Sequence, residues 1–285
     1  MQAQGLWSIH LAVLLFGGTA QFARWIELPA IDITPLRSLF AALALLGYVV
    51  VRRQGLLLER AIDYALALLL GCLLALHWVT YFHAMQVAGI ALGVIALYTY
   101  PLITVLIEPL LAGARPARVD IFIGLLVLYA IYLMTPEFSW ANQTTQGIFW
   151  GVVSAFLFAL RNVLQKGYFS RYPAQRSMLY QALIVVLVLL PWLTVEPSSI
   201  EAFQWWQLLL LGIVFTALPH SLFVHGLKFQ KAKTASLIAC LQVVYSVLLG
   251  WLLFDQWPQA TVLIGGLIIV SVAVYESYFA RRAGY

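Results

Sequence analysis

Residues 62–82 read IDYALALLLGCLLALHWVTYF, an almost unbroken apolar run that is long enough to cross a bilayer as one helix. The run lacks the alternation of apolar and polar residues that a strand of a membrane β-barrel would show. Nine further runs of similar length and composition occur in the chain, so the sequence predicts ten membrane-spanning helices. The predicted spans are residues 7–26, 34–52, 62–82, 87–111, 119–135, 147–166, 177–195, 206–225, 232–254 and 260–280.

The composition indicates that most of the surface faces lipid. Of the 285 residues, 63% are apolar and only 9% are charged, whereas a soluble domain carries about 25% charged residues. These values exclude a typical soluble enzyme, a disordered chain and a disulfide scaffold. The two cysteines, Cys72 and Cys240, lie inside apolar runs, without a metal-binding spacing. We therefore expect buried packing cysteines, no metal and no cofactor.

The basic residues predict the orientation in the membrane. With a cytoplasmic N-terminus, thirteen of the 16 Lys and Arg residues fall in cytoplasmic connections, Arg24 and Arg37 fall outside, and Arg161 lies within a span. This asymmetry follows the positive-inside rule and explains the net charge of +5 without nucleic-acid binding. We expect a multi-pass protein of the inner (plasma) membrane with both termini in the cytoplasm. No Lys or Arg precedes the first span, so we expect that span to be retained rather than cleaved as a signal peptide.

The chain also contains an internal repeat. A shift of 142 residues brings identical or similar residues into register, and each half holds five predicted spans. Because five is odd, the second half enters the membrane in the inverted orientation. The expected fold class is an all-α membrane protein of ten helices in two five-helix inverted repeats (5+5), residues 7–135 and 147–277, as in secondary transporters. The matched pairs are Phe16 with Phe158, His83 with His225, Thr104 with Ser246, Pro116 with Pro258 and Gly124 with Gly266.

Both halves resemble a known family. The stretch Thr34-Pro35-Leu36-Arg37-Ser38-Leu39-Phe40-Ala41-Ala42-Leu43 is similar to the opening of the second helix in the EamA branch of the drug/metabolite transporter superfamily. Tyr81 to Pro116, which contains Tyr98-Thr99-Tyr100-Pro101-Leu102, resembles the third-to-fourth helix region of that family, and Phe223 to Pro258 resembles its counterpart in the second half. The resemblance implies a ten-helix carrier of a small organic metabolite, commonly an exporter.

The sequence departs from the family pattern at two places. The first half reads Ala112-Gly113-Ala114-Arg115-Pro116 where the family usually has Leu-Gly-Glu-Arg, whereas the second half keeps an acid, Asp255, at the corresponding place. Gln242-Val243 stands where many members have Glu-Pro, so no role of that carboxylate carries over to this chain.

Polar side chains near the middle of spans are the candidate substrate-binding residues, because such groups are costly in hydrocarbon and usually face a cavity or a partner. Tyr100 and Gln242 are equivalent under the 142-residue shift, and both lie near mid-span. Thr104 and Ser246 lie one turn further along the same helices, and Tyr245 lies three residues from Gln242. These residues would bind a substrate at the membrane midplane, or they would form hydrogen bonds between helices.

Arg161 is the one clearly intramembrane cation, and Asn162 and Gln165 extend it into a polar patch. Three interpretations are open for Arg161. It could bind a substrate carboxylate, it could pair with Glu108 at a similar depth, or its side chain could extend to the membrane interface.

Arg24 and Arg37 are expected near the outer face. There we favour ion pairs with Glu27 and Asp32, or an outer gate, over direct substrate binding. His77 and His220 could titrate near neutral pH and couple transport to protons, or they could be packing residues. No Asp or Glu lies near the middle of a span, so the sequence does not support a proton relay through a midplane carboxylate.

The function expected from these features is the export of amino acids or related zwitterionic or amine compounds by alternating access. A sugar-phosphate or nucleotide-sugar carrier of the same superfamily is the alternative, although bound phosphate usually requires several converging Lys or Arg residues. A channel is less favoured. We expect no enzyme, because the chain lacks a His-Glu-x-x-His or Gly-x-Ser-x-Gly motif. The expected partners are a small-molecule substrate and the lipid bilayer; a monomer would suffice, and a homodimer is left open.

Overall fold

The computed structural model describes residues 2–111, 113, 118–134, 139–239, 241–255 and 257–282. Regular secondary structure within these residues is helical, without β-strands. Two short 3₁₀ turns, Leu190–Trp192 and Pro197–Ser199, and a π-helical turn, Ile213–Ala217, accompany the α-helices. The α-helices are α1 (Gln2–Thr19), α2 (Phe22–Trp25), α3 (Ala30–Val51), α4 (Ala61–Ala88), α5 (Ile90–Leu97), α6 (Tyr100–Leu111), α7 (Arg118–Met134), α8 (Gln143–Tyr168), α9 (Ala174–Leu189), α10 (Ala202–Gly212), α11 (Leu218–Leu227), α12 (Ala232–Ala239), α13 (Leu241–Phe254) and α14 (Ala260–Arg282).

Seven helical stretches are long and apolar enough to cross a membrane, and each coincides with a predicted span. The other three predicted spans, 119–135, 232–254 and 260–280, fall on α7, on α12 with α13, and on α14. There the described residues do not provide an apolar helix of that length. The structure thus bears out the all-helical membrane fold. The seven stretches are Gln4–Trp25, Ala30–Val51, Ala61–Ala88, Ile90–Leu111, Gln143–Tyr168, Ala174–Trp192 and Ala202–Leu227.

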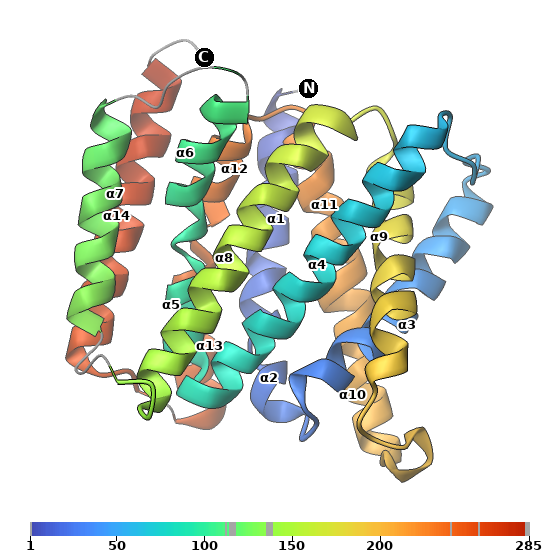
Figure 1. The fold of residues 1–285 in the computed structure, drawn as a ribbon, viewed down its shortest axis with the longest axis horizontal. Helices are drawn as coiled ribbons and strands as arrows, with labels where there is room; N and C mark the ends of the chain where they lie inside the picture. The colour runs from blue at the N-terminus through green and yellow to red at the C-terminus, as the bar shows by residue number, and fades with distance from the viewer. Residues whose placement is uncertain are drawn as a thin grey trace.

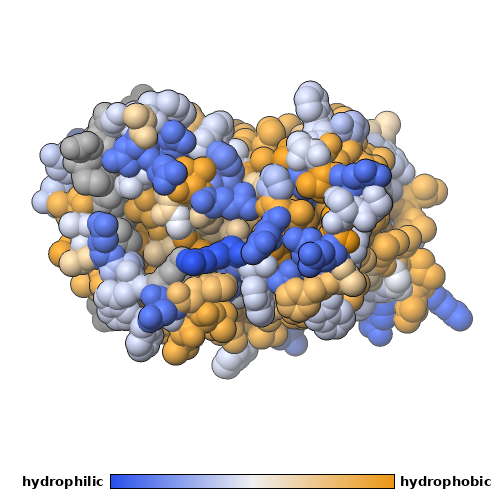
Figure 2. All heavy atoms as spheres, turned by 90° about the horizontal axis from the view of Figure 1, so that it is seen from below, coloured by the Kyte–Doolittle hydropathy of each residue, from blue (hydrophilic) through white to orange (hydrophobic). Residues whose placement is uncertain are grey.

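Large apolar side chains cover the outside of the helices. Trp7, Val51, Leu187 and Leu252 are each more than two-thirds exposed, as expected of a surface that faces hydrocarbon. Hydrophilic side chains gather instead at the helix ends. Figure 2 views one such end, where they occupy the middle of the face and apolar residues surround them.

Helices from the two halves of the sequence pack side by side. In Figure 1, α4 lies along α8, α3 along α9 and α1 along α11. Small residues permit this close packing: a Cβ added to Gly151 of α8 would lie 2.5 Å from the Cβ of Ala96. The first residues of α1 and the last residues of α14 lie at the same end of the bundle, which we call the terminal end (Figure 1). The other end, seen in Figure 2, is the opposite end.

Two of the spanning stretches are irregular near their middle. The helix of residues 90–111 is interrupted at Tyr98 and Thr99, just before Pro101, which has no N–H to donate to a preceding carbonyl. The stretch of residues 202–227 contains the π-helical turn Ile213–Ala217, just before Pro219. Interruptions of this kind often occur at functional sites. Tyr98 and Tyr100 line the cavity described below, and so does His220, three residues after the π-helical turn.

Candidate functional site

A cavity of about 30 Å³ lies at the centre of the bundle. It has room for about two water molecules, far less than the several hundred Å³ of a typical small-molecule site. Its wall is largely aromatic, with a few polar groups. The lining residues are Phe16, Thr19, Arg37, His77, Trp78, Tyr81, Leu97, Tyr98, Tyr100, Phe158, His220, Phe223, Ala239 and Gln242.

Arg37 of α3 is the cation on this wall, and its side chain is only 1% exposed. The guanidinium carbon lies 4.3 Å from the ring centroid of Trp78 and 4.6 Å from that of Phe82, both within the range of a cation–π interaction. Nη1 donates to Thr216 Oγ1 at 3.4 Å. Nε and Nη2 are buried and have no hydrogen-bond partner among the described residues.

This placement corrects the prediction that Arg37 pairs with Asp32 near the outer face. Asp32 is buried and accepts instead from the backbone N–H of Thr194 at 2.6 Å and from its hydroxyl at 2.5 Å. Among the described residues Arg24 forms no salt bridge with Glu27 either; its guanidinium carbon lies 5.4 Å from the ring centroid of Phe254. A salt bridge does join Arg171 to Asp63, with 3.8 Å between Nη1 and Oδ2.

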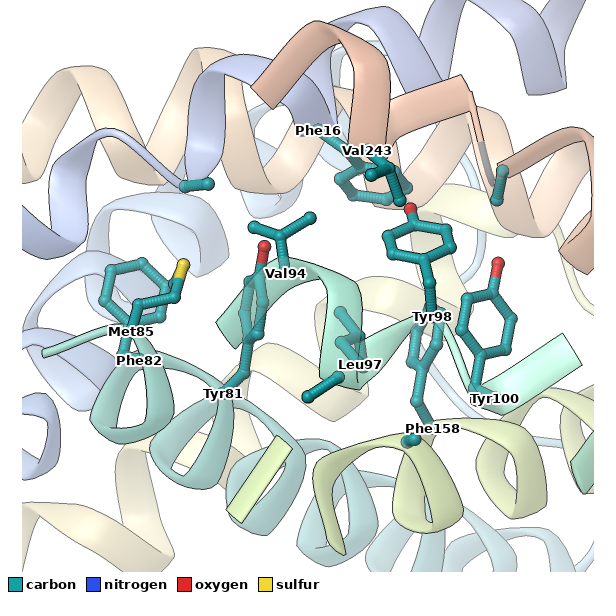
Figure 3. Packing of buried hydrophobic residues seen from close by; sticks show 14 of the residues in the cluster. Phe16, Tyr81, Phe82, Met85, Val94, Leu97, Tyr98, Tyr100, Phe158 and Val243 are labelled. Atoms are coloured by element: carbon teal, nitrogen blue, oxygen red, sulfur yellow. The ribbon is translucent and has the colours of Figure 1, made fainter. Parts of the chain in front are cut away.

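The amide of Gln242 connects two tyrosines across the cavity. Its Oε1 accepts from the Tyr98 hydroxyl at 2.5 Å, and its Nε2 donates to the Tyr81 hydroxyl at 3.3 Å. Tyr100 lines the same cavity, with its ring 5.0 Å from Phe158 and 5.5 Å from Tyr98. Figure 3 shows the hydroxyl groups of Tyr81, Tyr98 and Tyr100 directed toward the helix that carries Val243.

Replacing Gln242 by Leu is expected to destabilise the fold by about 1–3 kcal/mol, because the buried hydroxyls of Tyr81 and Tyr98 lose this partner. Thermal unfolding in detergent measures the effect. Tyr98→Phe combined with Gln242→Leu should cost less than the sum of the two single changes. If the costs were additive, the bond between Tyr98 and Gln242 would not matter for stability.

Both predicted histidines lie on the cavity. His77 Nδ1 lies 2.7 Å from Ser154 Oγ, and the His77 ring stacks on Phe158 with centroids 4.4 Å apart. His220 packs edge-on against Phe16 at 4.6 Å and Trp78 at 5.0 Å. Its Nδ1 is buried without a hydrogen-bond partner among the described residues. Proton coupling through either imidazole stays a prediction.

Three of the predicted binding residues lie elsewhere. The Thr104 hydroxyl donates to the carbonyl of Tyr100 at 2.8 Å, and the Ser246 hydroxyl donates to the carbonyl of Gly17 at 3.2 Å. The Ser246 hydroxyl thus bonds between helices, which was the alternative interpretation, whereas the Thr104 hydroxyl bonds within its own helix. Tyr245 lines a separate groove on the outside of the bundle, together with Leu6, Trp7, Ser8, His10, Leu11, Leu14 and Leu222.

Arg161 lies beyond the cavity wall, and its side chain is fully buried. Its Nε donates to Gln181 Oε1 at 2.8 Å, Nη1 to Asn162 Oδ1 at 2.9 Å, and Nη2 to the sulfur of Met178 at 2.9 Å. The full burial is inconsistent with a side chain that extends to the interface. Glu108 is not among these partners, so the contacts of Arg161 do not favour the interpretation as a pair with Glu108, which lies within electrostatic range of Lys166.

Ten of the fourteen lining residues form five pairs separated by the predicted interval of 142, whereas Thr19, Arg37, His77 and Tyr98 do not pair in this way. Sequence reasoning missed Trp78, Tyr81 and Tyr98 as lining residues. The repeat carried a signal for two of them, because Trp78 pairs with His220 and Tyr81 with Phe223, but not for Tyr98. The pairs in which both members line the cavity are Phe16 with Phe158, Trp78 with His220, Tyr81 with Phe223, Leu97 with Ala239, and Tyr100 with Gln242.

Comparison with known proteins gives consistent matches over the chain. The sequence model of the EamA-like transporter family matches residues 3–135 and again residues 145–275. An uncharacterized transporter of Archaeoglobus fulgidus is 27% identical, covering 93% of both chains. The pseudopaline exporter CntI of Pseudomonas aeruginosa is 24% identical, covering 87% of this chain and 86% of the exporter. An S-adenosylmethionine uptake transporter of Rickettsia conorii is 23% identical, covering 90% of this chain and 86% of the relative. A solved crystal structure superposes with a TM-score of 0.75 and 20% identity, with complete coverage of both chains, and supports the fold alone.

Proposed function

This chain belongs to the EamA-like transporter family, and from that premise we propose that it is a secondary carrier of a small carboxylate-bearing metabolite, such as an amino acid or a related zwitterion. The proposed site is the central cavity, and the proposed mechanism is alternating access between two inverted five-helix halves. The proposed direction is export, from an inner membrane in which both termini face the cytoplasm. Relatives are named both for export and for uptake, so the family does not fix the direction.

One observation carries the proposal: a buried arginine at the cavity wall with two free donors. A guanidinium inside a membrane protein is costly unless it is paired. Nε and Nη2 of Arg37 lie on the same edge of the guanidinium, and together they form the fork that binds both oxygens of a carboxylate. No carboxylate among the described residues occupies this edge. The substrate would therefore supply the negative charge.

The rest of the cavity suits a zwitterion. The aromatic wall, which includes Tyr81, Tyr100 and Phe158, suits an ammonium or an apolar group, and the amide of Gln242 supplies a polar group on the same wall. A phosphorylated sugar fits less well, because Arg37 is the only Arg or Lys on the wall among the described residues.

Two contacts, one near each end of the bundle, join the first half to the second. At the opposite end Asp32 accepts from Thr194, which we call the Asp32 contact. At the terminal end Tyr172 donates to Asp63 at 2.5 Å, and Arg171 lies 3.8 Å from the same carboxylate, which we call the Asp63 contact. Burial and the bond with Asp63 raise the pKa of Tyr172, so the phenol stays protonated and continues to donate.

In the proposed mechanism, the small cavity and these two contacts represent a contracted state. A metabolite needs a cavity roughly ten times larger than the present one. Opening one end while the other contact holds would enlarge the cavity toward one side of the membrane at a time, as alternating access requires.

The test is efflux from liposomes that contain the purified protein. Each compound carrying a carboxylate is compared with its amide, for instance L-phenylalanine with L-phenylalaninamide, and S-adenosylmethionine and a sugar phosphate complete the panel. We expect saturable efflux of at least one carboxylate, with its amide transported at least 10-fold more slowly. Efflux that fails to saturate for every compound would indicate a channel. Preference for the sugar phosphate, or for the amides, would contradict the proposed site.

A further inference from the structure

The cavity wall is not symmetric, and its asymmetry concerns Arg161. Thr19 lines the cavity. The residue that corresponds to it under the 142-residue shift is Arg161, which does not line the cavity. Arg37 and Arg161 are placed alike in the fold. Helix α3 begins at the opposite end of the bundle, and Arg37 lies seven residues after its first residue. Helix α8 ends at the terminal end, and Arg161 lies seven residues before its last residue. Each is about 10 Å along its helix from that end.

The contacts of Arg161 leave its charge uncompensated. Every hydrogen bond of this fully buried guanidinium goes to a neutral group. One of these groups is the thioether of Met178, which is a weak acceptor. The neighbouring Asn162 is 2% exposed, and its Nδ2 has no partner among the described residues. A carboxylate that replaced the thioether would pair with Arg161 and could also accept from Asn162.

Arg161 is close to the cavity although it does not line it. Phe158, one helical turn earlier on α8, forms part of the wall. His220, also on the wall, lies within electrostatic range of both Arg161 and Arg37. The two arginines therefore flank the cavity, with Arg37 toward the opposite end and Arg161 toward the terminal end.

We propose that Arg161 and Asn162 form a second carboxylate-binding site of the transport path, which binds the substrate when the carrier is open at the terminal end. The inference rests on the proposed function. If the two halves are inverted copies, exchanging their conformations produces the oppositely facing state. In that state position 161 takes the place that Thr19 has now, on the cavity wall. The substrate carboxylate then passes from Arg37 to Arg161 as the opening changes sides.

Thiol labelling tests this site without knowledge of the substrate. Cys72 and Cys240 are first replaced by Ser, and Asn162→Cys then provides a single thiol. This thiol is treated with one of two methanethiosulfonate reagents: an anionic one that carries a sulfonatoethyl group, or a cationic one that carries a trimethylammonioethyl group. Asp63→Asn weakens the Asp63 contact, and we expect it to raise the anionic labelling rate at least 10-fold. Asp32→Asn, the matched control at the other end, should not raise it. Tyr172→Phe removes only a hydroxyl and replaces Asp63→Asn if that variant does not fold.

The charge of Arg161 is tested in the same background. Arg161→Gln should lower the ratio of anionic to cationic labelling at least 10-fold, and Arg161→Lys should keep most of it. The proposal would be overturned if the thiol stayed unreactive in both Asp63→Asn and Tyr172→Phe. It would also be overturned if the ratio of anionic to cationic labelling did not change when Arg161 was replaced. The carboxylate preference measured by efflux does not depend on these results, so a failure here is distinguishable from a failure of the central site.

Discussion

Arg37→Gln is expected to lower carboxylate efflux by about 30- to 4,000-fold. The estimate follows from the 2–5 kcal/mol that is lost when one partner of a buried, hydrogen-bonded charge pair is truncated, at a factor of ten for each 1.4 kcal/mol. Gln keeps a polar side chain of similar reach, but it lacks both the positive charge and the two-donor edge. The initial rate of saturable efflux from liposomes measures the effect.

Lysine at the same position separates charge from geometry. Arg37→Lys restores the positive charge without the planar fork, so we expect an intermediate rate, well above that of Arg37→Gln. The matched control is Arg24→Gln, which removes an exposed arginine that lies against Phe254. The control should transport within about twofold of the unmodified protein, as expected for a surface change. Normal transport by a folded Arg37→Gln would remove the central argument for a carboxylate substrate.

The sequence was sufficient to predict the helical spans and the family, because these features depend on patterns summed over many residues. Every predicted span falls on helix in the described residues, and the family that the motifs resembled is the family whose model matches. The 142-residue interval was also readable, since a pair such as Tyr100 and Gln242 needs only two positions to be compared. Such signals survive errors of a few residues at each helix end.

The partners of individual charged residues were not predictable in this way. Arg37 and Asp32 are five residues apart on one helix, and sequence proximity favoured an ion pair between them. The structure instead places Trp78 and Phe82 of α4 against Arg37, and Thr194 against Asp32. Which side of α3 faces which neighbour depends on the rotation of the helix and on packing between distant segments. Arg161 illustrates the same limit, since its partner Gln181 comes from the next helix.

The packing that sets the position of Arg37 depends on a glycine of another helix. Gly212 is the last residue of α10, immediately before the π-helical turn. A Cβ built on it would lie 2.4 Å from the backbone carbonyl oxygen of Arg37 and 2.8 Å from the Cβ of Phe40. Backbone atoms cannot rotate out of the way as a flexible side chain can, so α3 and α10 would have to separate.

Gly212→Ala is therefore expected to destabilise the protein by about 1–3 kcal/mol, the usual cost of overpacking, and to reduce efflux as well, because the shift acts on the backbone of Arg37. Gly47→Ala is the matched control on the same helix as Arg37, since a Cβ there meets nothing within 4 Å. Replacing a helical glycine at such an open position should be neutral or stabilising by up to about 1 kcal/mol. Thermal unfolding in detergent and efflux rates are measured for both variants. If Gly212→Ala were as stable and as active as Gly47→Ala, the close contact between α10 and α3 would not be what positions Arg37 at the cavity.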